Sequence, residues 1–217
     1  MLSRVLALAL CGTLLAATAT KAQDAPSANP LDAAPSQQSP IELFGETLIF
    51  FLPDWTDGLS TADVMNASTV DRQENSTQFL IEMVPSEQTL EEWRDIFAIL
   101  AQKGDVSVAS ELDTIEANYM QGCDPARTLV VRSDRVENPP TDGSGYATVF
   151  CGAYAADSAQ GEIGVFRVVR QGDVTARIYR EWRGPAFDLA DRANFPVSVE
   201  RLRAINERML ATGFAGE

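Results

Sequence analysis

The stretch Glu162–Arg183, EIGVFRVVRQGDVTARIYREWR, sets the fold class that we expect for this chain. Two runs rich in β-branched and aromatic residues flank the pair Gly172-Asp173, a pattern typical of a β-hairpin with a two-residue turn. In such a hairpin the strands are antiparallel, and alternate side chains of both strands lie on one face. The stretch therefore predicts one hairpin of an antiparallel sheet.

Other segments predict further strands and three helices. Four more apolar runs predict strands at 46–52, 77–84, 127–132 and 146–154. A capping box at Thr89–Glu92, followed by apolar residues at helical spacing, predicts a helix that ends at Gly104. Two more helices are expected, one at 111–121 capped by Ser110, and one from Ser198 to about Gly213.

The expected fold class is therefore α+β. The predicted order is β-β-α-α-β-β-β-β-α, which places four consecutive strands after a pair of helices. Consecutive strands with short connections favour an antiparallel sheet, here of about six strands, with the helices packed on it.

Two arginines of the hairpin are the candidate binding residues. With a two-residue turn, Arg167 and Arg180 lie on one otherwise apolar face, and Trp182 lies beside them. The planar guanidinium group binds carboxylate or phosphate with two hydrogen bonds, so the pair could form an anion pocket backed by Trp182. The favoured alternative is internal pairing with acidic residues of the first predicted helix, for instance Glu91, Glu92 or Asp95.

The charge and the composition exclude several classes of function. The chain has 217 residues with no histidine, which rules out histidine-based catalysis and histidine-ligated metal sites within it. It has 17 basic and 31 acidic residues, a formal net charge of −14, so it is a poor candidate for binding nucleic acid. The charge is uneven, because residues 23–126 hold 19 acidic and 3 basic side chains, whereas residues 127–217 hold 12 of each.

The first 40 residues predict export. Residues 1–22 have Arg4, an uncharged apolar run and small residues before a cleavage point after Ala22, as a secretory signal peptide does. Residues 23–40 are rich in Pro, Ala and Ser and predict a disordered linker. A single domain at 41–217 would follow, located in the periplasm of a bacterium or secreted from it, with no membrane span after cleavage.

Cys123 and Cys151 are the two cysteines that remain after signal cleavage. An even number of cysteines in an oxidising compartment indicates a disulfide. The rival interpretation is a pair of free thiols, but no histidine and no C-x-x-C spacing would lower a thiol pKa. We therefore predict a structural disulfide between Cys123 and Cys151.

Part of the chain resembles the PsbP/Mog1-like domains. The resemblance rests on a strand, a Pro-x-Trp turn, a second strand and a capped helix, in Phe50–Trp55, Thr77–Val84 and Thr89–Trp93. It implies an α/β/α sandwich and a binding or assembly factor rather than an enzyme. The helix pair, the antiparallel strands and the last helix are also similar to helix-grip folds, which enclose a ligand cavity.

The leading functional hypothesis is an exported, non-enzymatic domain that binds an envelope protein or a small anionic ligand. The alternative is a carboxylate-based hydrolase of envelope glycans, because two carboxylates can perform acid–base chemistry without histidine. We predict no catalytic residue and no cofactor. We also predict no metal site, since Asp54-x-x-Asp57 and Asp188-x-x-Asp191 lack the spacing of a calcium loop.

Overall fold

A seven-stranded antiparallel sheet is the main element of the structure, a computed structural model that describes residues 37–135 and 143–216. The strand order is β3-β4-β5-β9-β8-β7-β6, and every neighbouring pair is antiparallel. The strands are β3 (Ser68–Glu74), β4 (Gln78–Pro85), β5 (Asp95–Lys103), β6 (Thr128–Arg132), β7 (Ser144–Cys151), β8 (Gln160–Gln171) and β9 (Val174–Pro185).

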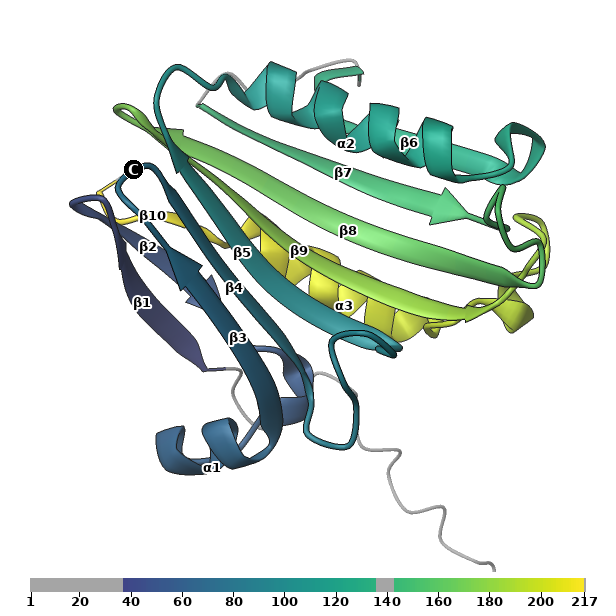
Figure 1. The fold of residues 1–217 in the computed structure, drawn as a ribbon, viewed down its shortest axis with the longest axis horizontal. Coiled ribbons are helices and arrows are strands. Elements are labelled where there is room, and N and C mark those ends of the chain that lie inside the picture. The colour runs from purple at the N-terminus through teal and green to yellow at the C-terminus, as the bar shows by residue number, and fades with distance from the viewer. Residues whose placement is uncertain (1–36, 136–142, 217) are drawn as a thin grey trace, which may run out of the picture. The chain divides into compact units, whose positions relative to one another are not determined.

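Different elements cover the two faces of this sheet (Figure 1). Helix α2 (Val108–Gly122) packs on one face over β7 and β8. On the other face lie α3 (Val199–Leu210) and a small sheet of β1 (Gln38–Leu43), β2 (Glu46–Phe51) and β10 (Gly213–Phe214). The short elements are α1 (Thr61–Asn66), η2 (Asp54–Thr56), η3 (Pro125–Arg127), η4 (Ser133–Arg135) and η5 (Arg192–Asn194).

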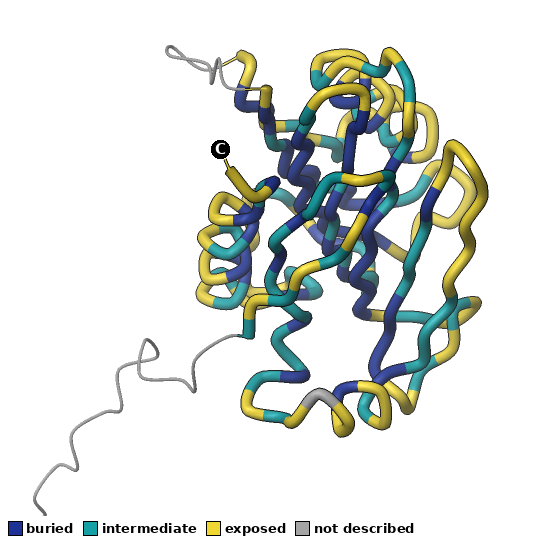
Figure 2. The backbone as a smooth tube through the Cα atoms, turned by 90° about the vertical axis from the view of Figure 1, so that its left-hand side faces the viewer, coloured by how far each residue is buried: buried dark blue, intermediate teal, exposed yellow. Residues whose placement is uncertain are grey.

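The apolar core is divided between these two faces. The larger cluster joins the main sheet to α3 and the small sheet, and the smaller one joins it to α2 through Leu112 and Ile115. Figure 2 shows the buried residues concentrated in the strands, with exposed residues on loops and on the outer side of helices. Within the described residues, no helix is both long and apolar enough to cross a membrane.

Most of the predicted elements are confirmed. The hairpin has its two-residue turn, because Gln171 pairs with Val174, and the four other predicted strands are present within a few residues. The last helix begins after Ser198, whose hydroxyl accepts a hydrogen bond from the backbone N–H of Arg201. The helix predicted at 111–121 is α2, but its cap is Ser107 rather than Ser110.

The helix predicted after Thr89 is wrong, because residues 95–103 form the strand β5. The capping contact exists, since the Thr89 hydroxyl accepts a hydrogen bond from the N–H of Glu92, but the helix does not continue. Instead, the side chain of Gln88 accepts hydrogen bonds from the N–H groups of Arg94 and Asp95. Strand β5 lies between β4 and β9 and is buried on both faces, so its apolar run is continuous and lacks strand alternation.

This correction also removes one of the three parts of the PsbP/Mog1-like resemblance, the capped helix. The strands β1, β3, β5 and β10 and helix α1 add to the predicted set, so the order and the strand number differ from the prediction. Strand β1 begins at Gln38, inside the linker predicted at 23–40, and the folded unit therefore starts before residue 41. The predicted signal peptide and residues 23–36 lie outside the described residues.

The predicted disulfide is present. Cys123 and Cys151 are bonded, with their Cα atoms 5.8 Å apart, and both residues are buried. Cys123 directly follows α2 and Cys151 ends β7, so the bond attaches the C-terminal end of the helix to the sheet.

Candidate functional site

The register of the β8–β9 hairpin brings two acidic side chains together. Gly164 pairs with Glu181, and Glu162 is the diagonal neighbour of Glu181 on the same face. This is the face that α2 covers, because Phe166, two positions further along β8, packs against the helix cluster. Between the C-terminal half of α2 and this face lies a cavity of about 320 Å³. Both glutamates line it.

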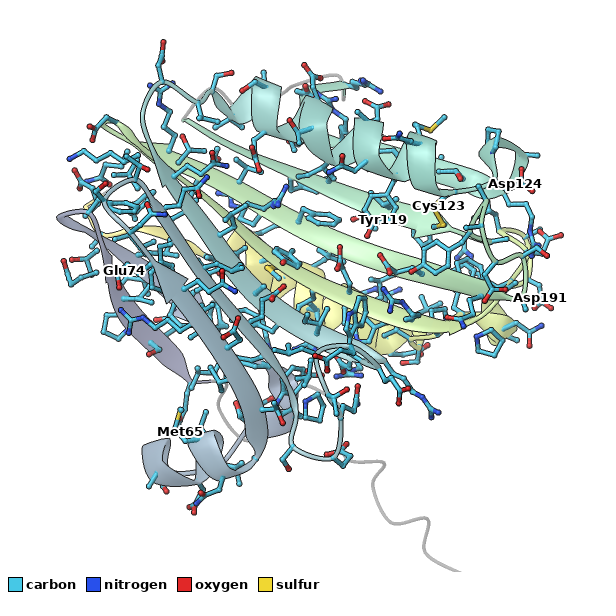
Figure 3. All side chains as sticks on the ribbon, viewed as in Figure 1. Met65, Glu74, Tyr119, Cys123, Asp124 and Asp191 are labelled. Atoms are coloured by element: carbon cyan, nitrogen blue, oxygen red, sulfur yellow. A yellow bond between two sulfur atoms is a disulfide. The ribbon has the colours of Figure 1, made fainter. Side chains whose placement is uncertain are left out.

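Tyr119 of α2 connects the two carboxylates. Its hydroxyl oxygen lies 2.5 Å from Oε1 of Glu162 and 2.8 Å from Oε1 of Glu181. Figure 3 shows Tyr119 towards the C-terminal end of α2, near Cys123. A hydroxyl group has one proton to donate, so these two contacts favour a state in which one of the two glutamates is protonated.

The surroundings assign this proton to Glu181. Burial and the negative charge of Glu162 raise the pKa of Glu181 to about 8. Glu162 instead accepts a hydrogen bond from the Tyr154 hydroxyl and lies 3.4 Å from Arg183 Nη2. Burial also raises the pKa of Tyr119 well above its usual value, so the hydroxyl stays protonated. The Tyr119 hydroxyl thus links Glu181 to Glu162.

Gly164 leaves the space that the Tyr119 hydroxyl occupies. A Cβ atom on Gly164 would lie 2.8 Å from the Tyr119 oxygen and 2.6 Å from the ring of Phe166. Both distances are shorter than real Cβ contacts, so a side chain at this position would displace the tyrosine. A glycine between the two glutamates is therefore required for the three groups to meet.

Arg183 forms the wall at the mouth of the cavity. Its guanidinium carbon lies 3.9 Å from the centre of the Trp93 ring, and its Nε donates a hydrogen bond of 3.1 Å to the Tyr154 hydroxyl. Together with the contact to Glu162, an aromatic face, a hydroxyl group and a carboxylate hold this guanidinium. The site thus already contains one bound guanidinium group, which belongs to the chain itself.

The charges of the cavity are paired except at Glu181. Arg177, which also lines the cavity, forms an ion pair with Glu111 at 3.0 Å, and Arg183 contacts Glu162. Among residues 37–135 and 143–216, no ion pair includes Glu181. The charges of Arg177 and Arg183 lower the pKa of Glu181, but burial and the charge of Glu162 outweigh them.

A wider groove of about 1330 Å³ adjoins the cavity. Trp93 and Arg183 line both spaces, so the cavity and the groove meet at this stacked pair. Three exposed acidic side chains lie along the groove, namely Glu87, Glu91 and Glu92. The groove therefore has a rim that is acidic on balance on the side of the loop that precedes β5, with these three carboxylates against the exposed Arg94.

Arg180, one of the predicted binding residues, is buried on the opposite face. Its side chain is 1% exposed, and its Nη2 lies 2.5 Å from Asp95 and 3.0 Å from Asp54. Arg201 of α3 binds the other oxygens of both aspartates. Burial opposes ionisation of Asp54, but hydrogen bonds and charge from Arg201 and Arg180 outweigh it and lower its pKa to about 2. Asp95 is the internal partner that the sequence offered as the alternative to an anion pocket.

Arg167 and Trp182 lie on the same face as Arg180, as the hairpin register predicts. Arg167 is buried, and its Nε donates a hydrogen bond of 3.3 Å to the carbonyl group of Thr212. Trp182 is 1% exposed and lies under the guanidinium groups of Arg180 and Arg201, at 5.3 and 5.6 Å. The contacts of these residues are internal, and a role in ligand binding stays a prediction.

The two-residue turn predicted from the sequence places Glu181 on the face opposite to Arg180, but the sequence gives no sign of the residues that Glu181 contacts. The hairpin register could have paired Glu181 with Glu162, because it follows from the turn alone. The position of Tyr119 depends on how α2 packs, which no local pattern shows.

Within the described residues, no group of three or more Asp, Glu, Cys or His side chains could hold a metal ion. Asp54 and Asp57 instead bind Arg201 and Arg208.

Comparisons with known proteins do not assign this site to a family. A scan against protein-family models finds no match to the sequence, and a search of curated proteins finds no significant similarity.

Proposed function

We propose that this chain is an exported binding domain, and that its ligand carries a guanidinium or amine cation into the cavity beneath α2. The observation that carries the proposal is Glu181, a partly buried carboxyl group that faces the cavity and has no ion-pair partner among the described residues. A ligand cation would be the missing partner and would allow Glu181 to ionise.

The walls of the cavity fit such a group. The rings of Trp93, Tyr119, Tyr154 and Tyr179 line the space together with the two carboxyl groups. Aromatic faces attract cations, and they also bury the apolar stem that carries a guanidinium or ammonium group. Arg183 demonstrates this mode of binding within the chain, since Trp93 and Glu162 hold its guanidinium. The acidic rim of the groove would attract a cationic ligand towards the cavity.

The contacts of Glu162 favour binding over hydrolysis, because both of its side-chain oxygens already have partners within the chain. A carboxylate that acts as a base or nucleophile needs a free oxygen directed at the substrate. In this structure Tyr119 contacts Oε1 of Glu162, while Tyr154 and Arg183 contact its Oε2. Both oxygens of the Glu162 side chain are thus already engaged.

The expected result with butylguanidinium as the probe is an affinity that rises about tenfold between pH 7 and pH 9. The reason is that Glu181, with a pKa of about 8, holds a proton in the free protein at pH 7 and must release it when the cation binds. Isothermal titration calorimetry in buffers of different ionisation enthalpy measures both the affinity and the proton released.

The stability of the ligand-free protein should change with pH in the opposite direction to the affinity. Its free energy of unfolding falls as the pH rises from about 4.5 to 8, because the folded state holds the proton of Glu181 more tightly than the unfolded state does.

Two controls make this experiment specific. Butylurea has nearly the same shape as butylguanidinium without its charge, and we expect it not to compete. Glu181→Gln should remove the pH dependence and most of the affinity, whereas Glu74→Gln on the exposed edge strand β3 should change neither. Equal binding of both probes, or an unchanged affinity in Glu181→Gln, would refute the proposal.

A second candidate function is the carboxylate-based hydrolase of envelope glycans. The observation in its favour is the pair itself, since a protonated glutamic acid beside an ionised one is the arrangement of a general acid and its partner. If this function is correct, we expect release of soluble fragments from peptidoglycan, lost in Glu181→Gln and in Glu162→Gln but retained in Glu74→Gln. The absence of any fragment release by the wild-type protein would exclude peptidoglycan as its substrate.

A further inference from the structure

Arg177 is a second charged group in the cavity beneath α2 whose hydrogen bonding is incomplete. Its Nη1 lies 3.0 Å from Oε1 of Glu111, and its guanidinium carbon lies 5.5 Å from the centre of the Tyr179 ring. Its Nε is buried, and within the described part of the chain it has no hydrogen-bond partner. A buried donor without an acceptor is costly, so Arg177 can still gain from an acceptor.

Among residues 37–135 and 143–216, Arg180 is the one other arginine with buried nitrogen atoms that lack a partner. The two arginines differ in the space beside them. The cavity that Arg180 borders has about 10 Å³, which is room for no more than a water molecule. The cavity that Arg177 lines has about 320 Å³. A ligand can therefore reach Arg177 and not Arg180.

The ion pair with Glu111 leaves Arg177 able to bind another carboxylate. The guanidinium group has five N–H donors in one plane, so it can hold more than one carboxylate at a time. Three other arginines of the chain each form ion pairs with two or more carboxylates, namely Arg132, Arg180 and Arg201. In the described part of the chain, Arg177 forms an ion pair with Glu111 alone. A second carboxylate would give Arg177 the pattern that these arginines show.

The fold places Arg177 and Glu181 at separate positions along one cavity. They are four positions apart on β9, about 13 Å along the strand, and both line the cavity. Tyr179 lies between them on the same face, and its ring also lines the cavity. The volume of about 320 Å³ is near the lower end of the range for small-molecule sites, about 300–1,000 Å³. The site thus fits a small molecule with a charge at each end.

We propose that the ligand of this cavity is a small zwitterion, an ω-guanidino or ω-amino acid, whose cation pairs with Glu181 and whose carboxylate accepts hydrogen bonds from Arg177. The proposal rests on the proposed function for the cation and adds the carboxylate. The methylene stem between the two charges would lie along the ring of Tyr179. A simple amine or guanidine would leave the Nε of Arg177 without an acceptor, so it should bind more weakly.

A series of ω-guanidino acids, from 3-guanidinopropanoate to 6-guanidinohexanoate, tests the proposal on the wild-type protein. Each acid is compared with its primary amide, which has nearly the same shape without the negative charge. By isothermal titration calorimetry at pH 9, at least one acid should bind about tenfold more tightly than its amide, because only the carboxylate makes charge-assisted hydrogen bonds to Arg177. The chain length with the largest ratio of affinities then measures the spacing of the two charges in the ligand.

The double variant Glu111→Gln/Arg177→Gln identifies the residue that binds the carboxylate. It removes both members of the buried ion pair, so no unpaired charge remains. The ratio of acid to amide affinity should fall to about one in this variant. The ratio is the readout, because the loss of Arg177 also changes the charge near Glu181. The matched control Arg72→Gln/Glu74→Gln removes an exposed ion pair on β3 and should keep the wild-type ratio.

The outcomes separate this proposal from the proposed function. If butylguanidinium binds but no acid of the series binds more tightly than its amide, the zwitterion is wrong and the cation site remains. If butylguanidinium does not bind, both proposals fail. A ratio that persists in the folded double variant would also overturn the assignment of the carboxylate to Arg177. The comparison of acid with amide needs no variant, so it decides the ligand class even if the double variant folds poorly.

Discussion

Arg180→Ala is expected to lower the free energy of unfolding by about 3 kcal/mol, because it removes the buried cation shared by Asp54 and Asp95 and leaves Arg201 as the one arginine that pairs with both. Arg180 is 1% exposed, and the aspartate side chains that it binds, Asp54 and Asp95, are 17% and 11% exposed. Arg201 still contacts both aspartates in the variant, so the expected loss lies at the lower end of the range for broken buried ion pairs. Urea denaturation at pH 7 measures this loss.

The same variant has a characteristic pH dependence. In the wild-type protein the pKa of Asp54 is lowered to about 2 from its ordinary 3.8. The ion pairs of Asp54 therefore contribute stability above pH 3.8, which is lost as the pH falls towards 2. In Arg180→Ala the pKa of Asp54 should rise, and the variant should lose stability at a higher pH than the wild type.

A comparison with an exposed arginine makes the result interpretable. Arg72→Ala removes a surface pair with Glu74 and should cost less than about 0.5 kcal/mol. If Arg180→Ala also left the stability unchanged, the internal network would not be its role. Loss of anion binding in such a stable variant would then support the anion pocket that the sequence suggested for Arg167, Arg180 and Trp182.

Removal of the disulfide is expected to cost about 3.6 kcal/mol, since the bond closes a loop of 28 positions between Cys123 and Cys151. The effect should reach the candidate site as well as the overall stability. The N–H of Cys123 donates a hydrogen bond of 2.9 Å to the carbonyl group of Tyr119, so the bond anchors the end of α2 that carries this tyrosine. A freer helix end would weaken the link between Glu162 and Glu181.

The double variant Cys123→Ala/Cys151→Ala tests this expectation. Its urea midpoint should be lower than that of the oxidised wild type and close to that of the wild type under reducing conditions. Its affinity for butylguanidinium at pH 9 should also fall, even at temperatures where it is fully folded. A midpoint equal to that of the oxidised protein would show that the bond contributes no stability.

Short-range interactions explain the elements that were predictable. The Gly172-Asp173 turn, the cap at Ser198 and the alternation along β8 and β9 involve residues only a few positions apart, and the structure confirms them. The shared face of Arg167 and Arg180 follows from that turn in the same way. The disulfide was predictable for another reason, because only two cysteines remain outside the predicted signal peptide.

Strand β5 could not be predicted from its own residues. Its spacing of apolar residues fits a helix as well as a strand, and the capping contact of Thr89 forms although no helix follows. The outcome depends on the backbone pairing of β5 with β4 and with β9, whose residues lie about 80 positions further along the chain. Burial between two strands outweighs the local preference for a helix.

In the candidate site, too, some features follow from local sequence and others only from long-range packing. Local sequence explains why Glu162, Gly164 and Glu181 share one face of the hairpin, because the two-residue turn determines their register. Tyr119 lies 43 and 62 positions away from the two glutamates, and it meets them only because α2 packs on that face and the disulfide holds its end there. Long-range packing therefore decides the protonation state of Glu181, since burial and the charge of Glu162, rather than the residue type, raise its pKa.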